Sequence, residues 1–201
     1  MNASEALSRL KKLGVPVATT ADAAAVLGLS SSAASHTLRR LAAAQLIAAV
    51  RKGVWALTDQ PDRLGLIEYV TAPYPGYLSL QSALYQHGMI DQIPSMIYVV
   101  TLARTARVET PFATYSLHHV QPAFFDGYES VAGSGAKLAT PEKALVDFFY
   151  LSPTRARLFA ALPELRVPET FRWKTARLWV RQIPSTRMRT IVNRRLQELA
   201  R

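Results

Sequence analysis

The chain has 201 residues, of which 49% are apolar and 19% are charged, and this balance is typical of a folded protein rather than a disordered one. No apolar run is long enough for a membrane-spanning helix, and the N-terminus lacks the basic and apolar segments of a signal peptide, so we expect a cytoplasmic protein with no membrane partner. The absence of cysteine excludes disulfides, thiolate metal sites and a cysteine nucleophile.

The formal net charge of +10 is unevenly distributed along the chain. Residues 1–60 carry a net charge of +4, residues 61–150 carry −3 and residues 151–201 carry +9. A basic head and a basic tail on either side of an acidic middle indicate two surfaces for a polyanion such as a nucleic acid. The alternative is a charge excess that only keeps the protein in solution.

Apolar residues at helical spacing predict three helices in the first sixty residues. Capping residues and glycines then predict where these helices begin and end. They are a first helix that ends near residue 14, a second over residues 21–27, and a third from the serines at 30–32 to about residue 44.

The third of these helices has two faces of different chemistry. With Leu38 at the centre of the buried face, the helical period places three residues on the same side, namely Ala34, Leu41 and Gln45. The opposite side carries Ser32, His36, Arg39, Arg40 and Ala43. The helix is therefore expected to display serine, histidine and arginine to solvent.

Two short strands are predicted next, over residues 46–50 and 54–58. The turn between them is basic and consists of Arg51, Lys52 and Gly53, of which Gly53 is free to take a positive φ. Helix, helix, turn, helix and basic hairpin is the layout of a winged helix-turn-helix, whose recognition helix enters the major groove of DNA. Each part alone is more often plain packing or a solvated loop, and the ordered set carries the prediction.

The predicted DNA-binding residues lie on the third helix, at its serine-rich start and in the hairpin turn. They are Ser31, Ser32, Ser35, His36, Arg39, Arg40, Arg51 and Lys52. His36 and Arg40, with Ser32 and Ser35, are candidate contacts to bases and groove edges. Arg39, Arg51 and Lys52 are candidate contacts to phosphates. The start of the helix adds backbone N–H groups that suit a phosphate.

Two parts of the sequence resemble a known family. The run TTADAAAVLGLSSSAASHTLRRLAAAQLI, followed by RKGVWAL, resembles the N-terminal winged helix of AbiEi-type antitoxins, the transcriptional autoregulators of bacterial type IV toxin–antitoxin systems. The resemblance continues in YLSLQSALYQHGMIDQIPSMIYVVTLARTARVETPFATYSLHHV and in KLATPEKALVDFFYL.

The resemblance implies a repressor that binds repeats in its own promoter, with double-stranded DNA as the direct partner. It also implies a C-terminal domain that opposes a nucleotidyltransferase-type toxin without forming a stable complex with it. A winged-helix regulator without a toxin partner is the alternative.

A proline- and aspartate-rich break at residues 59–62 predicts two domains, a DNA-binding domain over residues 1–60 and a second domain over residues 66–201. The second domain mixes both periodicities, so we expect an α+β fold. Strands are predicted over residues 96–103 and 114–120, and helices over residues 79–87, from 140 onward, over 152–162, over 174–182 and from 185 onward. Leu145, Phe148 and Phe149 form the expected buried stripe of the helix from residue 140.

The last two predicted helices are basic and amphipathic. The apolar stripes consist of Ala176, Trp179 and Val180 in the first, and of Met188, Ile191, Val192, Leu196 and Leu199 in the second. Four arginines lie off the second stripe and are expected to be exposed, as a possible secondary DNA contact: Arg187, Arg189, Arg194 and Arg195. Binding to a membrane surface is the alternative, but the bulky aromatic face that would favour it is missing.

No group of titratable residues in the sequence predicts catalysis. His118 and His119 are neighbours in a predicted strand and should point to opposite faces. Three acids, Asp126, Glu129 and Asp147, show no metal-ligand spacing, and no nucleotide- or zinc-binding motif occurs. We therefore expect no metal, no cofactor and no enzymatic activity. A DNA-processing enzyme that a winged helix directs to its target is the alternative from another class.

Overall fold

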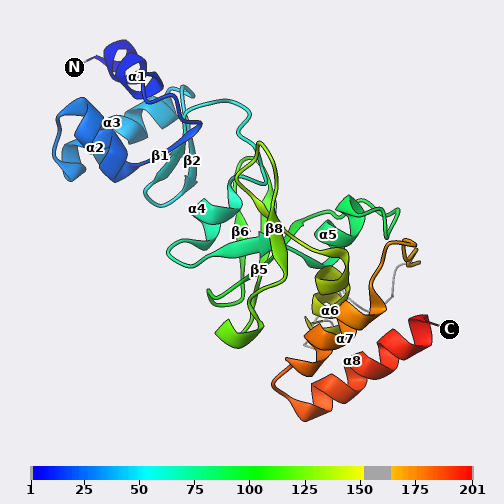
Figure 1. Cartoon of the computed structure of the whole chain (residues 1–201). Coiled ribbons are helices and arrows are strands. Elements are labelled where there is room, and N and C mark those ends of the chain that lie inside the picture. The colour runs from blue at the N-terminus through cyan, green and yellow to red at the C-terminus, as the bar shows by residue number, and fades with distance from the viewer. Residues whose placement is uncertain (1, 152–163, 201) are drawn as a thin grey trace. The chain divides into compact units, whose positions relative to one another are not determined.

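A computed structural model describes residues 2–151 and 164–200, and its class is α+β, as predicted. The chain forms two compact units, the first of Met1–Val70 with Glu109–Ala113 and the second of Thr71–Val108 with Thr114–Arg201 (Figure 1). The division after Val70 lies beyond the break at residues 59–62. The helix predicted over residues 152–162 lies outside the described residues. Within the described ranges, no helix has the length and apolarity needed to cross a membrane.

The first unit consists of helices packed on a small sheet. Its elements, in chain order, are α1 (Ala3–Lys11), β1 (Val17–Thr19), α2 (Thr20–Leu27), α3 (Ser31–Ala43), β2 (Ala48–Arg51), β3 (Val54–Ala56) and α4 (Ile67–Thr71), the last of which reaches the division. The three strands form an antiparallel sheet in the order β1-β3-β2. The predicted hairpin is therefore present as β2 and β3, and β1 was not predicted.

Side-chain caps and left-handed residues set the ends of α2 and α3. Thr19 and Asp22 form a capping box at the start of α2, in which the Asp22 N–H donates to Thr19 Oγ1 at 3.1 Å and the Thr19 N–H donates to Asp22 Oδ2 at 2.8 Å. Gly28, with a φ of 66°, ends α2 in the left-handed conformation that glycine adopts without strain. Ser30 caps α3 by accepting from the Ala33 N–H at 3.3 Å. These two helices match the predicted ranges closely.

The expected position of Gln45 on the buried face of α3 is wrong. The helix ends at Ala43, and Gln45 lies beyond it with a φ of 57° and an exposed side chain. The buried residues of α3 are Ala34, Leu38 and Leu41, as predicted. Leu38 and Leu41 pack with Leu10 of α1 and Trp55 of β3 in the core of the first unit.

The second unit combines a mixed sheet with helices. Its elements are β4 (Gly76–Leu78), α5 (Leu80–Gln86), β5 (Ile97–Thr101), β6 (Ala106–Glu109), β7 (Thr114–His119), a 3₁₀ helix (Pro122–Phe124), β8 (Tyr128–Ser130), β9 (Lys137–Ala139), α6 (Pro141–Leu151), α7 (Trp173–Arg181) and α8 (Thr186–Leu199). The strand order is β6-β7-β5-β4-β9-β8. Strand β5 pairs with β7 and β4 pairs with β9 in parallel, whereas β4–β5 and β8–β9 are antiparallel. The predicted strands are β5 and β7.

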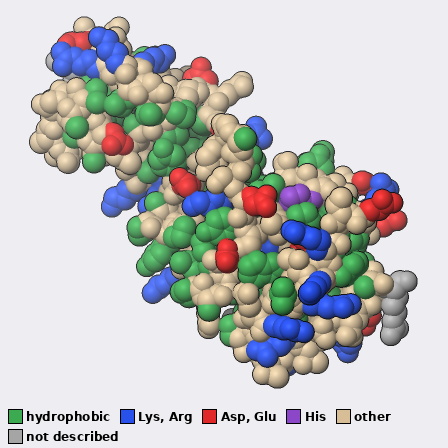
Figure 2. Space-filling view, in the orientation of Figure 1, with side chains coloured by type: hydrophobic (Ala, Val, Ile, Leu, Met, Phe, Trp, Pro, Cys, Tyr) green, Lys and Arg blue, Asp and Glu red, His purple; other side chains and the backbone are tan. Residues whose placement is uncertain are grey.

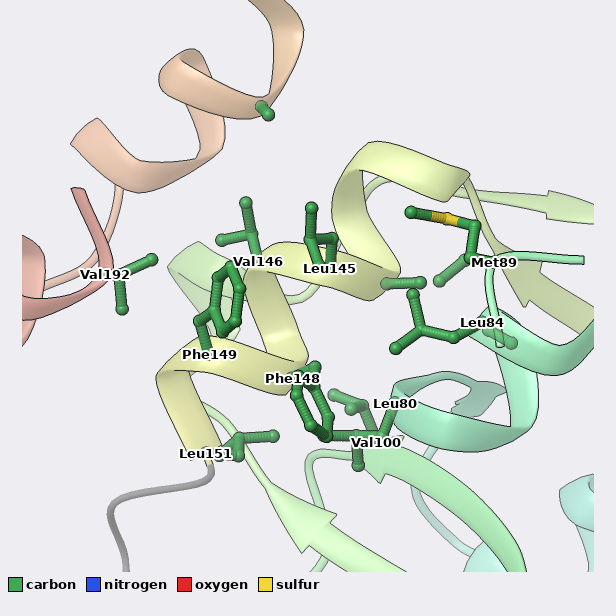
Figure 3. Close-up of a cluster of buried hydrophobic side chains, with 14 of the residues drawn as sticks. Leu80, Leu84, Met89, Val100, Leu145, Val146, Phe148, Phe149, Leu151 and Val192 are labelled. Carbon is green, nitrogen blue, oxygen red and sulfur yellow. The ribbon is translucent and has the colours of Figure 1, made fainter. Parts of the chain in front are cut away.

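Helix α6 is the centre of the second unit's core (Figure 3). The predicted stripe of Leu145, Phe148 and Phe149 is buried, but the opposite side of the helix is buried as well. The core residues around it come from α5, β5 and α8 and include Leu80, Leu84, Val100 and Val192. A helix enclosed on all sides has no solvent face for its polar residues, so these must find partners inside the protein.

Two of those polar residues form a buried ion pair. Lys143 and Asp147 lie one turn apart on α6 with fully buried side chains, and Lys143 Nζ contacts Asp147 Oδ1. The Tyr77 hydroxyl accepts from Lys143 Nζ at 2.9 Å and donates to Asp147 Oδ2 at 3.0 Å, and Ser79 Oγ donates to the same oxygen at 2.8 Å. Burial lowers the pKa of Lys143, while Asp147 acts in the opposite direction, and burial raises the pKa of Tyr77. This cluster was not predicted, because Tyr77 and Ser79 come from a part of the chain far from Lys143 and Asp147.

Candidate nucleic-acid interface

The exposed face of α3 has the chemistry that was predicted for it. Ser31, Ser32, His36, Arg39 and Arg40 are exposed and Ser35 is half-buried. Helix α3 contains no acidic residue. His36 and Arg40 lie one turn apart, and neither side chain has a hydrogen-bond partner among the described residues. Both are therefore available to a partner outside the chain.

A groove with a volume of about 430 Å³ brings α3 together with the β2–β3 hairpin. From the helix it is lined by Ser35 and Arg39, and from the hairpin by Arg51, Lys52 and Gly53 among others. Arg39 Nη2 donates to Ser35 Oγ at 3.1 Å, which holds the guanidinium along the helix. Lys52 is exposed at the turn. The groove thus gathers residues that were singled out separately from the sequence.

The hairpin turn is bound to the start of α2. The Thr20 N–H donates to the Gly53 carbonyl at 2.9 Å, and Trp55 Nε1 donates to Thr20 Oγ1 at 3.0 Å. Gly53 has a φ of 81°, as expected for the glycine of this turn. These bonds hold the position of Lys52 relative to the helices of the same unit.

Arg51, predicted to contact phosphates, forms hydrogen bonds inside the first unit. Its side chain is directed to α4, where Nη1 donates to the carbonyls of Tyr69 at 3.1 Å and Val70 at 3.3 Å. These are main-chain acceptors near the end of a helix, which a guanidinium satisfies well. We therefore reassign Arg51 to the attachment of α4 to the hairpin.

The basic tail is exposed at only two of its four predicted arginines. Arg187 and Arg194 are exposed, and Arg194 Nε lies 3.9 Å from Glu198 Oε1. Arg189 is half-buried because its Nε and Nη2 donate to the Ile183 carbonyl at 3.2 and 2.8 Å. Arg195 is half-buried with its guanidinium carbon 5.8 Å from the centre of the Phe149 ring. The predicted exposure is wrong for these two.

Helix α7 supplies further exposed cations that were not singled out from the sequence. They are Lys174, Arg177 and Arg181. Their signal was the amphipathic pattern of the helix, whose buried residues are Ala176 and Val180 while Trp179 is half-buried. Figure 2 shows Lys and Arg side chains gathered over the part of the second unit where Figure 1 places α7 and α8. We call Lys174, Arg177, Arg181, Arg187 and Arg194 the tail cations.

The paired histidines do not form a site. His118 is half-buried, stacks on the Tyr98 ring at 6.0 Å and has its Nε2 2.9 Å from Ser116 Oγ, and burial lowers its pKa. His119 is exposed, with Nδ1 3.2 Å from the Leu102 carbonyl. In the described parts of the chain, no three histidines or acids are grouped so as to hold a metal ion.

No protein-family model matches the chain, and no curated protein was found to be similar to it.

Proposed function

We propose that the chain is a sequence-specific DNA-binding transcriptional repressor whose first unit is a winged helix-turn-helix. In this proposal α3 is the recognition helix and the β2–β3 hairpin is the wing. One observation carries it: α3 is a helix with one buried face and an opposite face of serine, histidine and arginine without any acid. Such a face suits the negative phosphates and the hydrogen-bonding base edges of a major groove.

The side chains on this face of α3 and at the hairpin turn divide into two roles in this proposal. His36 and Arg40, with Ser32 and Ser35, contact base edges. Arg39 and Lys52 contact phosphates, since both are cations lining the groove between α3 and the hairpin. Ser31, in the first turn of α3, adds a backbone N–H group at the positive end of the helix.

A footprint on the DNA upstream of the gene tests the proposal directly. The full chain is expected to protect a discrete site, and the double variant Arg39→Ala/Arg40→Ala is expected to lose that protection. Arg9→Ala is a matched control, because Arg9 is an exposed arginine of α1 whose partner is Glu5, one turn away on the same helix. Absence of any protected site, or equal loss in the control, contradicts the proposal.

We further propose that the protein is the antitoxin of a type IV toxin–antitoxin pair and acts by binding rather than by catalysis. The support is the resemblance to AbiEi-type antitoxins, which continues through stretches of the second unit such as KLATPEKALVDFFYL. Its functional partner is then a nucleotidyltransferase-type toxin that it opposes without a stable complex. A regulator without a toxin is the second candidate, and the presence or absence of a toxin gene beside this one separates the two.

The tail cations are proposed as a second contact to the DNA backbone. They are five exposed positive charges on two neighbouring helices of one unit. Charge of this density attracts phosphates without regard to base sequence. The contact would therefore add affinity rather than specificity.

A further inference from the structure

The second unit contains a cavity of about 430 Å³ that none of the proposed DNA-binding residues lines. It lies where strands β8 and β9, the start of α6 and the segment before α7 meet. Its polar lining consists of His87, Glu129, Ser130, Thr140, Glu142, Thr170 and Arg172. Val131, Leu138 and Pro141 add apolar wall. A concave site with a few convergent polar groups on an apolar wall is the usual form of a small-molecule site.

Glu142 is the most unusual of the lining residues. Its side chain is only 3% exposed, and its Oε1 accepts from the Arg172 main-chain N–H at 2.8 Å and lies 3.5 Å from Arg172 Nε. The other oxygen, Oε2, is buried and has no hydrogen-bond partner among the described residues. Buried acceptors without a donor are rare in proteins. Glu142 lines the cavity, so an N–H group of a ligand that reaches Oε2 would supply the missing donor.

Arg172 places a complementary charge beside this carboxylate. Its side chain is 70% exposed and is tied to Glu142 through Nε alone, so its Nη groups can bind an anion. A metal ion is a poor occupant, because no three acids or histidines are grouped to ligate one within the described residues. An adjacent acid and guanidinium, each with unused capacity, match a ligand that carries an ammonium and a carboxylate close together.

We propose that this cavity binds a free α-amino acid with an apolar side chain. The ammonium donates to Glu142 Oε2, the carboxylate accepts from the Arg172 guanidinium, and the side chain packs on Val131, Leu138 and Pro141. A peptide is a poorer match, because its ammonium and carboxylate belong to different residues. His87 acts as fixed wall, since its Nε2 lies 2.7 Å from the Ala139 carbonyl and carries the proton in that bond.

The test uses the full chain and does not depend on DNA binding. Each L-α-amino acid is added singly at millimolar concentration, and thermal unfolding and the heat of binding are measured. An apolar amino acid is expected to raise the Tm, because a ligand that binds only the folded state stabilises it. The amine and the carboxylic acid that correspond to the best amino acid each lack one charge. The amine and the carboxylic acid are each expected to bind at least about tenfold more weakly than the amino acid.

Two variants then locate the site. Glu142→Gln keeps an acceptor for the Arg172 N–H but removes the negative charge, and Arg172→Gln changes an exposed side chain while its main-chain bond remains. Each is expected to weaken binding about tenfold or more. Arg166→Gln is the control, because Arg166 is 68% exposed and pairs with Asp91 instead of lining the cavity.

Three outcomes would overturn the proposal: no amino acid affects either measurement, the amine alone binds as tightly, or Arg172→Gln binds like the control. Because Arg172 is exposed, this last variant remains decisive even if Glu142→Gln fails to fold.

Discussion

Arg40 lies on the exposed face of α3 one turn after His36 and has no partner among the described residues. If it reads a base edge, Arg40→Ala should cost about 1–3 kcal/mol of binding free energy on the cognate site and much less on random DNA. Binding titrations on both DNAs at one salt concentration measure this difference. Equal losses on the two DNAs would reassign Arg40 to the phosphate backbone.

Arg51 and Lys52 are neighbours in sequence but should respond differently to salt. Lys52→Ala removes an exposed cation, so the slope of log affinity against log salt should fall by about one unit. Arg51→Met should leave that slope unchanged, because the guanidinium is bound to the Tyr69 and Val70 carbonyls. The same variant should lower the free energy of unfolding by about 1–3 kcal/mol, since the two carbonyls lose their donor. A shallower slope for Arg51→Met would restore it as a phosphate contact.

His118 gives the stability a dependence on pH. Burial lowers its pKa below the ordinary 6.5 of histidine. As the pH falls below 6.5, the unfolded chain takes up a proton that the folded chain resists, so the free energy of unfolding decreases until the folded pKa is reached. Above pH 6.5 His118 is neutral in both the folded and the unfolded chain, so it does not make the free energy of unfolding depend on pH. His118→Phe retains a ring against Tyr98, and urea unfolding at a series of pH values should show a flatter profile for this variant. Identical profiles for both proteins would contradict the assignment.

At the scale of elements, α6 depends on the partners of its buried charges. Replacing Lys143 by Met leaves Asp147 as an uncompensated buried charge, and replacing Asp147 by Leu does the same to Lys143. Each single change should lower the free energy of unfolding by about 3–5 kcal/mol. The double variant should lose much less than the sum, because both charges are then gone. Denaturant unfolding of the four proteins measures the coupling, and additive losses would show that the pair is not coupled.

The tail cations have to be tested by substitution rather than by truncation. Val192 and Leu196 of α8 are buried in the core of the second unit, so a chain shortened before α7 would lose part of that core. Arg187→Gln/Arg194→Gln should make the salt dependence of DNA binding shallower, by about 0.9 units for each phosphate contact that is lost. Arg104→Gln/Arg166→Gln removes two other exposed arginines of the same unit and serves as the control. Equal slopes in both double variants would leave the tail as a solvated surface.

Helices with their own capping residues could be predicted from the sequence, whereas most three-residue strands could not. Strand β3 is the exception, because the basic turn with Gly53 marks its hairpin. Thr19, Gly28 and Ser30 mark the ends of α2 and α3 through local bonds that the sequence displays. Strands β1, β4, β8 and β9 have three residues each, too few for an alternating pattern to be recognised.

Interactions between residues far apart in the chain were also missed. The partners of Arg51 lie on α4, and those of Glu142 lie on the segment before α7. Such pairs depend on tertiary structure and leave no local pattern in the sequence. The exposed face of α3 follows from the helical period and was therefore predicted, whereas the hydrogen bonds of Arg51 were not.

At the scale of the whole molecule, repression and protection from a toxin should be separable. Arg39→Ala/Arg40→Ala changes only exposed side chains, so the protein should keep its Tm while losing repression of a promoter reporter. Cells that express the cognate toxin should remain protected, because the proposed antitoxic function belongs to the second unit. Loss of protection by a folded, normally expressed variant would show that protection works through DNA binding.

The converse experiment uses a fragment of the first unit. It should extend through Thr71, because Arg51 needs the Tyr69 and Val70 carbonyls. Promoter binding without protection is expected, and protection by this fragment alone would contradict the division of roles.

The two cores differ in how much of the chain each needs. The core of the first unit is built from residues between Ala3 and Leu57. The core of the second joins Tyr77 to Val192 and Leu196, near the other end of the sequence. Because the chain leaves the ribosome with its N-terminus first, all residues of the first core are available while most of the second core is still to be synthesised. A nascent chain can therefore complete the core around α3 before the second unit is complete, so whatever α3 binds can be engaged during translation.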